Sequence, residues 1–195
     1  MIKIVLASKS EIRKKILLEN GIHCSVEPSQ VDEDIIKESL LEEGATPEII
    51  SKNLAELKAN KVSQNNFDFL VLGADSVISH NNNLISKPRS REEALKILKI
   101  LNGSKHYLIS SVCFSKNGSM IWNYTDQSEL KMKNFRENEL LDYLNKIETK
   151  TLLAYGVYQV EADGLSLFEY IKGDQNSIMG LPIKQIINYI NEHKK

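Results

Sequence analysis

Residues 69–78 read FLVLGADSVI, an apolar stretch that contains one glycine and one acidic residue. Apolar residues occupy both alternating faces, which is typical of a strand buried on both sides of a sheet. An ionised Asp75 in such a strand costs several kcal/mol unless a cation or hydrogen-bond donors contact it. Gly73 lets another backbone or a ligand approach closely. Asp75 is therefore either a structural, salt-bridged or strand-terminal residue, or an acid at the mouth of a cleft that binds metal or accepts a proton. We favour the second interpretation.

Length and composition indicate an ordinary globular chain. The 195 residues are 42% hydrophobic and 26% charged, which predicts one domain over residues 1–195 with two lobes around one sheet. A formal net charge of -1 argues against a general nucleic-acid binder. The first apolar segment, residues 2–7, is too short for a signal-peptide core or a membrane span, so no membrane association is expected.

Cysteine and histidine usage predicts no metal-binding framework. Cys24 and Cys113 lie far apart without C-x-x-C spacing, which indicates small buried residues in a protein of the reducing cytoplasm. The four histidines show no ligand spacing, and we expect all of them at surface or loop positions. They are His23, His80, His106 and His193.

Strand and helix signals alternate in the first half of the chain, which predicts an α/β fold. Ser10, Thr46 and Ser90 are expected to cap helices, and Asn117-Gly118 is a strong hairpin signal. Strands are predicted at 2–7, 23–28, 69–78, 84–86, 107–114, 120–124, 157–161 and 167–172. Helices are predicted at 11–20, before Gly44, at 47–64, 91–101 and 137–146, and after Pro182 to about residue 192.

A basic cluster, SKSEIRKK at residues 8–15, follows the first predicted strand. The turn into a helix presents backbone N–H groups and the positive end of the helix dipole to an anion. Ser8 and Ser10 add hydroxyl donors, while Arg13 and Lys14 add charge, a combination that suits a polyphosphate. The alternative is a solvated basic helix face. The segment is not a Walker A loop, because the required glycine and lysine spacing is missing.

Acidic and basic residues elsewhere fit a phosphate site if the fold brings them together. Mg²⁺ is typically held by one or two carboxylates plus phosphate oxygens and water, so Glu33 and Asp75 are candidate ligands, whereas Asp32 and Glu33 taken alone fit a solvated loop. Lys58 and Lys87 are candidates for neutralising charge on phosphate groups. The alternatives are a Lys58 that snorkels at the edge of the core and an ordinary surface Lys87.

In this order, these pieces resemble the Maf family of nucleotide pyrophosphatases over nearly the whole chain. The matching stretches are LASKSEIRKKILLENGI at 6–22, VDE at 31–33, LAELKA at 54–59, GADSVI at 73–78, KP at 87–88, LNGSKH at 101–106, GVYQVEADGLSLFEYIKGD from 156 and GLP ending at 182. The resemblance implies a mixed, twisted sheet flanked by helices, with two lobes around a central cleft as in Maf and ITPase-like folds. It also implies a homodimer.

The resemblance implies roles for individual residues. Asp75 takes the position of the proton acceptor that activates water in the presence of a divalent cation, Mg²⁺ or Mn²⁺. The implied reaction is attack of water on the α-phosphorus of a nucleoside triphosphate, which gives a monophosphate and pyrophosphate. The remaining expected positions are Glu33, with Asp75, for the metal; Lys58 and Lys87 for phosphate charge; and Ser8, Ser10, Arg13, Lys14, Ser76 and Glu161 for substrate.

Two departures from the family pattern leave alternatives open. Glu11 and Ile12 replace the Pro and the first Arg of the family's opening S-x-S-P-R-R, so Lys9 or Lys14 is expected to supply the missing charge. Glu161 stands near the base-recognition strand, where branches of the family differ, and the base preference stays open. We expect an enzyme that removes non-standard or surplus nucleotides; the alternative is a nucleotide-binding regulator of cell division with little or no turnover. A phosphatase is disfavoured because Asp75 lacks a second acid two residues on.

Overall fold

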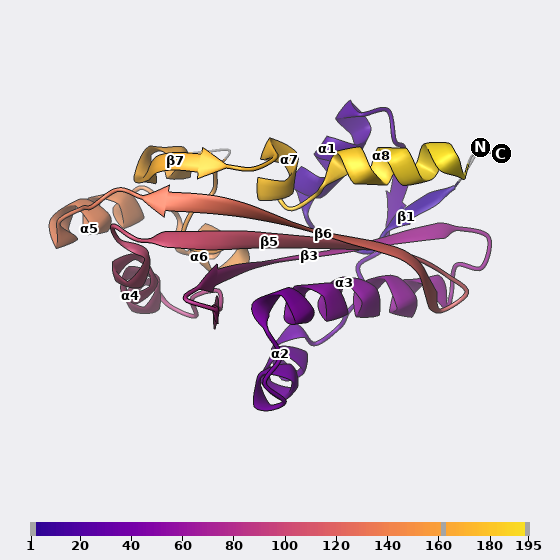
Figure 1. Cartoon of the computed structure of the whole chain (residues 1–195), viewed down its shortest axis with the longest axis horizontal. Helices are drawn as coiled ribbons and strands as arrows, with labels where there is room; N and C mark the ends of the chain where they lie inside the picture. Colours follow the sequence, from indigo (N-terminus) through magenta and orange to yellow (C-terminus); the bar gives the residue numbers. More distant parts are fainter. Residues whose placement is uncertain (1–2, 161–162, 194–195) are drawn as a thin grey trace.

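A mixed seven-stranded sheet runs through the molecule, which is a computed structural model that describes residues 3–160 and 163–193 (Figure 1). The strand order is β2-β1-β3-β5-β6-β7, and β4 pairs with β3 beside this path. The strands are β1 (Ile4–Leu6), β2 (Cys24–Val26), β3 (Leu70–His80), β4 (Asn83–Ile85), β5 (Lys105–Lys116), β6 (Ser119–Met132) and β7 (Phe168–Lys172). The predicted α/β class with a mixed sheet is confirmed.

Strand pairing places the quoted stretch at the centre of this sheet. β1 runs parallel to β2 and to β3, while β3 pairs antiparallel with β4 and β5. In the β3–β5 register Asp75 lies opposite Ser111 and Ser76 lies opposite Ser110. Because paired residues point to the same side of a sheet, Ser76 and Ser110 share one face.

Helices α2 (Glu33–Glu42) and α3 (Pro47–Ser63) lie on one side of the sheet (Figure 1). Thr46 caps α3 as expected, since its hydroxyl accepts the N–H of Ile49, and Pro47 occupies the first turn. Small side chains of α3, Ala55 and Ala59, pack with Val71 and Cys113 of the sheet. This helix therefore sits close to β3.

The other face of the sheet is covered by α1 (Glu11–Glu19), α7 (Gln175–Ile178) and α8 (Ile183–Glu192). Ser10 caps α1 by accepting the N–H of Arg13, as predicted. The core on this side includes Leu17, Leu72, Phe114 and Ile186, all buried. Segments from the beginning and the end of the chain thus share one hydrophobic core.

A second core lies at the far end of the long strands from the two termini (Figure 1). It is built by α4 (Arg91–Leu101), α5 (Glu137–Asn145), α6 (Thr149–Tyr155), a 3₁₀ helix (Asp163–Leu167) and β7. Ser90 caps α4 as expected. Leu98, Leu130 and Leu152 are fully buried there.

Several predictions about local structure are wrong. Residues 157–160 form no strand but an irregular segment with buried Val157 and Tyr158, while Glu161, at the end of that predicted strand, lies outside the described residues. β6 continues to Met132, well beyond the predicted end at residue 124, because Ser128, Leu130 and Met132 alternate inward. The short α6 and α7 were not predicted. None of the helices within the described ranges has the length and hydropathy that a membrane span requires.

The expected surface position is wrong for one histidine. His106 in β5 is fully buried, and burial, with a contribution from His80, lowers its pKa to about 4. Cys113 is buried as expected, and burial raises the pKa of its thiol to about 11. Cys24 is half-buried and also free.

Candidate active site

A cavity of about 480 Å³ opens where β1, β3 and β4 meet the N-terminal ends of α1 and α2 and the segments 154–160 and 178–180. Its charged residues and some of its serines, which we call the polar wall, are Ser8, Lys9, Ser10, Arg13, Glu33, Lys37, Lys58, Asp75, Ser76 and Lys87. A group of its apolar and aromatic residues, which we call the apolar wall, is Ile78, Ile85, Leu108, Val157 and Tyr158. The volume is in the range of small-molecule sites.

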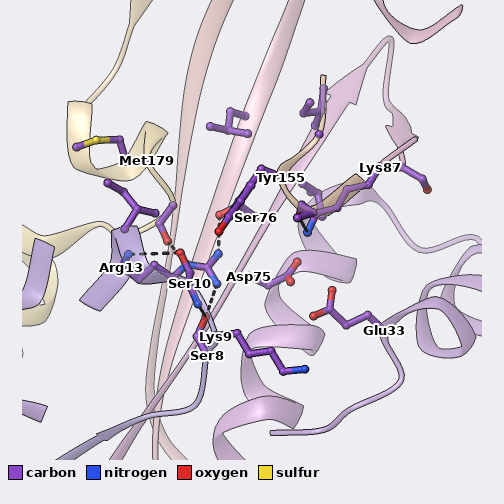
Figure 2. Close-up of a pocket in the computed structure, with 18 of the residues that line it drawn as sticks. Ser8, Lys9, Ser10, Arg13, Glu33, Asp75, Ser76, Lys87, Tyr155 and Met179 are labelled. Atoms are coloured by element: carbon purple, nitrogen blue, oxygen red, sulfur yellow. Dashed lines mark hydrogen bonds between the residues drawn. The ribbon is translucent and has the colours of Figure 1, made fainter. Parts of the chain in front are cut away.

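Asp75 is buried at the base of the polar wall, yet it still lines the cavity. Its Oδ1 lies 2.7 Å from Nζ of Lys58, and the same ammonium lies 2.7 Å from Oε1 of Glu33. Oδ2 of Asp75 has no hydrogen-bond partner among the described residues. Figure 2 shows the carboxylates of Asp75 and Glu33 turned toward each other. One lysine therefore joins two acids from separate elements.

The close contact between α3 and β3 puts Lys58 in this place. A Cβ added at Gly73 would collide with the backbone O of Ala55 and would lie 2.8 Å from the backbone N of Ala59. Only glycine therefore allows the helix to lie this near the strand, as the sequence predicted in general terms. The hydroxyl of Ser51 donates to the backbone O of Asp75 at 3.3 Å and adds a second tie. Lys58 is buried in an ion pair and does not snorkel, whereas Lys61 reaches the surface and donates to the backbone O of Gln30.

Glu33 begins α2, and the helix is capped by its neighbour Asp32, whose Oδ1 accepts the N–H of Ile35 at 3.2 Å. Asp32 is not among the residues that line the cavity. Of the two adjacent acids, Asp32 therefore caps the helix and Glu33 faces the cavity. Partial burial raises the pKa of Glu33, but Lys58, with further contributions from Lys37 and Lys87, outweighs it and lowers this pKa to about 2. Glu33 is consequently a carboxylate at neutral pH.

The acid pair fits a hard divalent cation. No group of three or more His, Cys, Asp or Glu side chains that could hold a metal occurs in the described part of the chain. Mg²⁺ does not need such a group, because it is bound through one or two carboxylates together with phosphate oxygens and water. The unpartnered Oδ2 of Asp75 and the neighbouring carboxylate of Glu33 are donors of the right kind.

Ser8 and Ser10 keep hydroxyl hydrogens available for a ligand. Oγ of Ser8 accepts from the N–H of Ser10 at 3.3 Å and from Nη1 of Arg13 at 3.1 Å. Oγ of Ser10 accepts from the N–H of Arg13 at 3.4 Å. Each hydroxyl also has one hydrogen to donate, and no acceptor for it is found among the described residues. Both serines can therefore donate to an anion in the cavity.

Arg13 is occupied within the protein. It donates four hydrogen bonds: from Nε to the O of Gly180 at 2.9 Å, from Nη1 to Oγ of Ser8 and to the O of Ala74, and from Nη2 to Oγ of Ser76 at 3.1 Å. An arginine has five N–H donors, so one is left. Figure 2 shows Arg13 beside Ser8, Ser10 and Ser76, with dashed lines for the hydrogen bonds. Arg13 thus lines the cavity with one N–H donor left, and its predicted contact with substrate stays a prediction.

The remaining cations divide between cavity and surface. Lys87 lines the cavity and donates to the O of Ala154 at 2.9 Å; loss of hydration lowers its pKa, and Glu33 opposes that shift. Lys9 and the unpredicted Lys37 also line the cavity. Lys14 does not, because on α1 it follows Arg13 by one residue and turns outward, near Cys24 of β2. The expectation that Lys14 joins the site is therefore not supported, and Ile12 brings only an apolar side chain.

The apolar wall is ordered by packing and by one buried pair. The hydroxyl of Tyr158 lies 2.9 Å from Nε2 of His106, so the ring borders the cavity while its hydroxyl points into the second core. Phe168 packs edge-on against Tyr158, with ring centroids 4.9 Å apart. The expected contact of Glu161 with substrate falls outside the described residues.

Sequence reasoning missed Ser110, Tyr158 and Lys37. Ser110 is buried on β5 and contacts Ser76 and the O of Ser177. Its signal was a pair of adjacent serines in an otherwise apolar predicted strand, YLISSVCF at 107–114. Tyr158 gave no signal, because alternation at 157–160 is equally typical of a strand.

Comparisons with known proteins show which sequences and structures this chain is similar to. The family model described as Maf-like protein matches residues 3–193. A nucleoside triphosphate pyrophosphatase of Pelagibacter ubique (strain HTCC1062) is 62% identical over 188 residues, 96% of either chain. A 7-methyl-GTP pyrophosphatase of Brucella abortus biovar 1 (strain 9-941) is 34% identical over 99% of this chain and 97% of the relative. A solved HAM1 protein from Coxiella burnetii gives a TM-score of 0.43 at 15% identity over 68% of this chain and 73% of its own, which is too distant a likeness to argue from.

Proposed function

We propose, starting from the fact that this chain belongs to the family of Maf-like proteins, that it is a nucleoside triphosphate pyrophosphatase. Its reaction is the hydrolysis of a nucleoside triphosphate to the monophosphate and pyrophosphate. The observation that carries the proposal is the arrangement of the polar wall, in which Asp75, whose carboxylate is bound to Lys58, lines one cavity together with further lysines and serine hydroxyls. These groups meet the needs of the reaction, which are a proton acceptor, charge neutralisation and phosphate binding.

In this reaction the carboxylate of Asp75 takes the proton from the attacking water, while its Oδ1 stays bound to Lys58. Lys58 holds Asp75 and Glu33 at a fixed spacing and brings a positive charge to the phosphate side of the cavity. Ser8 and Ser10 donate hydroxyl hydrogens to phosphate oxygens. Lys87 faces them from the β4 side and neutralises charge on the departing pyrophosphate.

A divalent cation, Mg²⁺ or Mn²⁺, completes the site in our proposal and is held by Asp75 and Glu33. When bound, it adds positive charge at the triphosphate and lowers the pKa of water. We place the nucleobase against the apolar wall, which includes Tyr158. We further propose that the protein acts in the cytoplasm as a homodimer, in keeping with its two free cysteines and with the resemblance.

The proposal is tested by measuring pyrophosphate release from ribo- and deoxynucleoside triphosphates and 7-methyl-GTP, with Mg²⁺, with Mn²⁺ and with chelator. We expect Asp75→Asn to lower kcat by about 10³-fold, the range of a lost general base. Asp68→Asn is the matched control, since it changes an exposed acid just before the same strand. Equal turnover by wild type and Asp75→Asn would show that the assigned base is wrong.

Product identity separates the rival functions. Release of orthophosphate in place of pyrophosphate would indicate a phosphatase. Tight nucleotide binding without metal-dependent hydrolysis would favour a nucleotide-binding regulator, for which the neutral Ile12 in the opening motif is the motivating observation. Robust pyrophosphate release excludes both.

A further inference from the structure

Ser8, Ser10 and Ser76 belong to the polar wall, and Ser76 differs from the other two in the direction of its hydrogen bonds. Ser8 and Ser10 accept hydrogen bonds from the protein and retain a hydrogen for a ligand. Ser76, next to Asp75, lies between two side chains, since its Oγ is 3.1 Å from Nη2 of Arg13 and 2.9 Å from Oγ of Ser110. The direction of each of these bonds decides what Ser76 can offer a substrate.

The donor or acceptor at each end of this row of hydrogen bonds, Arg13 and the backbone O of Ser177, fixes which way the bonds between them run. Oγ of Ser110 donates its single hydrogen to the backbone O of Ser177 at 2.7 Å, because a carbonyl oxygen can only accept. Ser110 therefore has only lone pairs for Ser76, and Ser76 must donate to it. At the other end Arg13 has no acceptor atoms, so Ser76 accepts from it. The bonds run from Arg13 to Ser76 to Ser110 to Ser177, and each bond in such a chain polarises the next.

We propose that Ser110 is a positioning residue that makes Ser76 a pure hydrogen-bond acceptor toward the substrate. A serine hydroxyl has one hydrogen and two lone pairs. Ser76 donates its hydrogen to Ser110 and accepts a hydrogen bond from Arg13 with one lone pair. Its second lone pair remains free to accept a hydrogen bond from a substrate. Ser76 then cannot donate to a phosphate oxygen; it selects a substrate group that carries a hydrogen, either a ribose hydroxyl or a base N–H.

The surroundings keep Ser110 in this role. Ser110 is buried, and it lies opposite Ser76 in the β3–β5 register. The turn after α7 closes over the pair: a Cβ added at Gly180 would lie 3.0 Å from Oγ of Ser76, and the O of Gly180 accepts from Nε of Arg13. Arg13 is thus bound to Gly180 and Ser110 to Ser177, which belong to one short segment. This arrangement leaves the Ser76 hydroxyl little freedom to rotate.

This inference rests on the proposed function and adds the polarity of one substrate contact to it. It is tested with nucleotide pairs that exchange a donor for an acceptor at one place: ATP against ITP, CTP against UTP, and the preferred nucleotide against its 2′-fluoro and 3′-fluoro forms. We expect wild type to discriminate about tenfold in kcat/KM within at least one pair, the value of one unsatisfied hydrogen bond. For the fluoro pairs, the hydroxyl form is the preferred member.

Ser110→Ala removes the acceptor for the Ser76 hydrogen and lets Ser76 donate to the cavity. We expect the discrimination to fall to about threefold or less in this variant and in Ser76→Ala, with no further loss in the double variant. Ser115→Ala is the matched control, because Ser115 is equally buried on β5 but donates to Oδ1 of Asn60, away from the cavity. It should keep the wild-type ratios.

The same ratios are measured as calorimetric affinities in the Asp75→Asn background, so that the result does not depend on turnover. Failure of the proposed function appears as absent pyrophosphate release, whereas failure of this inference appears in the ratios. Ratios within threefold of unity for every pair in wild type overturn it. A folded Ser110→Ala protein that keeps the wild-type discrimination also overturns it, because a merely structural serine changes stability without changing selectivity.

Discussion

The polar and the apolar wall of the cavity are held in place in different ways. On the polar wall, Lys58 contacts two carboxylates and Arg13 makes four hydrogen bonds, so each side chain is fixed by several directed contacts. On the apolar wall, Tyr158 is hydrogen-bonded to His106 and packs against Phe168. Directed networks tolerate single changes poorly, while packed surfaces adjust. The chemistry is therefore expected to be more rigidly specified than the choice of base.

The largest expected difference between the walls concerns Lys58. Lys58→Met leaves Asp75 and Glu33 without their shared cation, and breaking a buried ion pair costs about 3 kcal/mol. We expect the free energy of unfolding to fall by that amount in urea titrations and kcat/KM to fall by about 10³-fold. Lys61→Met, one turn along α3 at the surface, is the control and should change either value little. Comparable losses in both variants would mean that α3, and not the ion pair, sets the site.

The walls also respond to acid in separate pH windows. Behind the apolar wall, His106, which contacts the hydroxyl of Tyr158, has a folded pKa near 4 against about 6.5 in the unfolded chain, so the unfolded state binds more protons between these values. Stability should fall as the pH drops from about 6.5 to 4, by on the order of 3 kcal/mol. On the polar wall, Glu33 has a lowered pKa, so its contribution is present above about 4.5 and is lost as the pH falls toward 2.

Unfolding free energies of wild type and His106→Gln between pH 7 and 3 test this separation. In the variant, the free energy of unfolding should no longer fall between pH 6.5 and 4, but it should still fall below pH 4. His80→Asn controls for the second histidine near His106, which contributes to the lowered pKa. An unchanged slope in His106→Gln would assign the acid sensitivity to other groups.

The smallest expected effect compares two glycines with similar backbones. Gly180 has φ of 93° and a Cβ there would press on Ser76 and Arg13, whereas Gly21 has φ of 73° and nothing within 4 Å. Alanine at either position costs about 1–2 kcal/mol of backbone strain. Only Gly180→Ala should also lower kcat/KM, by about tenfold, because it displaces polar-wall side chains. Equal activities in the two variants would show that the turn after α7 does not position the polar wall.

The sequence predicted local structure best at helix caps and turns, where the residue type itself favours one backbone conformation. Ser10, Thr46 and Ser90 cap helices as expected, and Asn117 and Gly118 form the β5–β6 turn with φ of 53° and 81°. The polar wall was predicted through short motifs and their order. Its internal contacts were not, because the Lys58–Asp75 pair depends on how close α3 lies to β3, a property of two elements together.

The errors share a physical cause. Residues 157–160 alternate like a strand, but in the fold they border the cavity and contact His106 without pairing with a strand in the described region. The second half of β6 is polar, and its inward row is recognisable only once β5 lies beside it. Arg13 was expected to bind substrate because its charge suits phosphate; it lines the cavity, but its hydrogen bonds within the protein, one of them to the distant Gly180, were not predicted. Such assignments depend on tertiary contacts that periodicity does not contain.

The bond between Arg13 and Gly180 joins residues 167 positions apart. At the usual 5–20 residues per second of protein synthesis, the ribosome adds the second partner roughly 10–30 s after the first. Throughout that interval the guanidinium of Arg13 is hydrated and lacks its carbonyl partner, and the cavity lacks the segment at 178–180. The polypeptide consequently completes its cavity late in translation, and a chain that ends before the last two helices lacks this part of the lining.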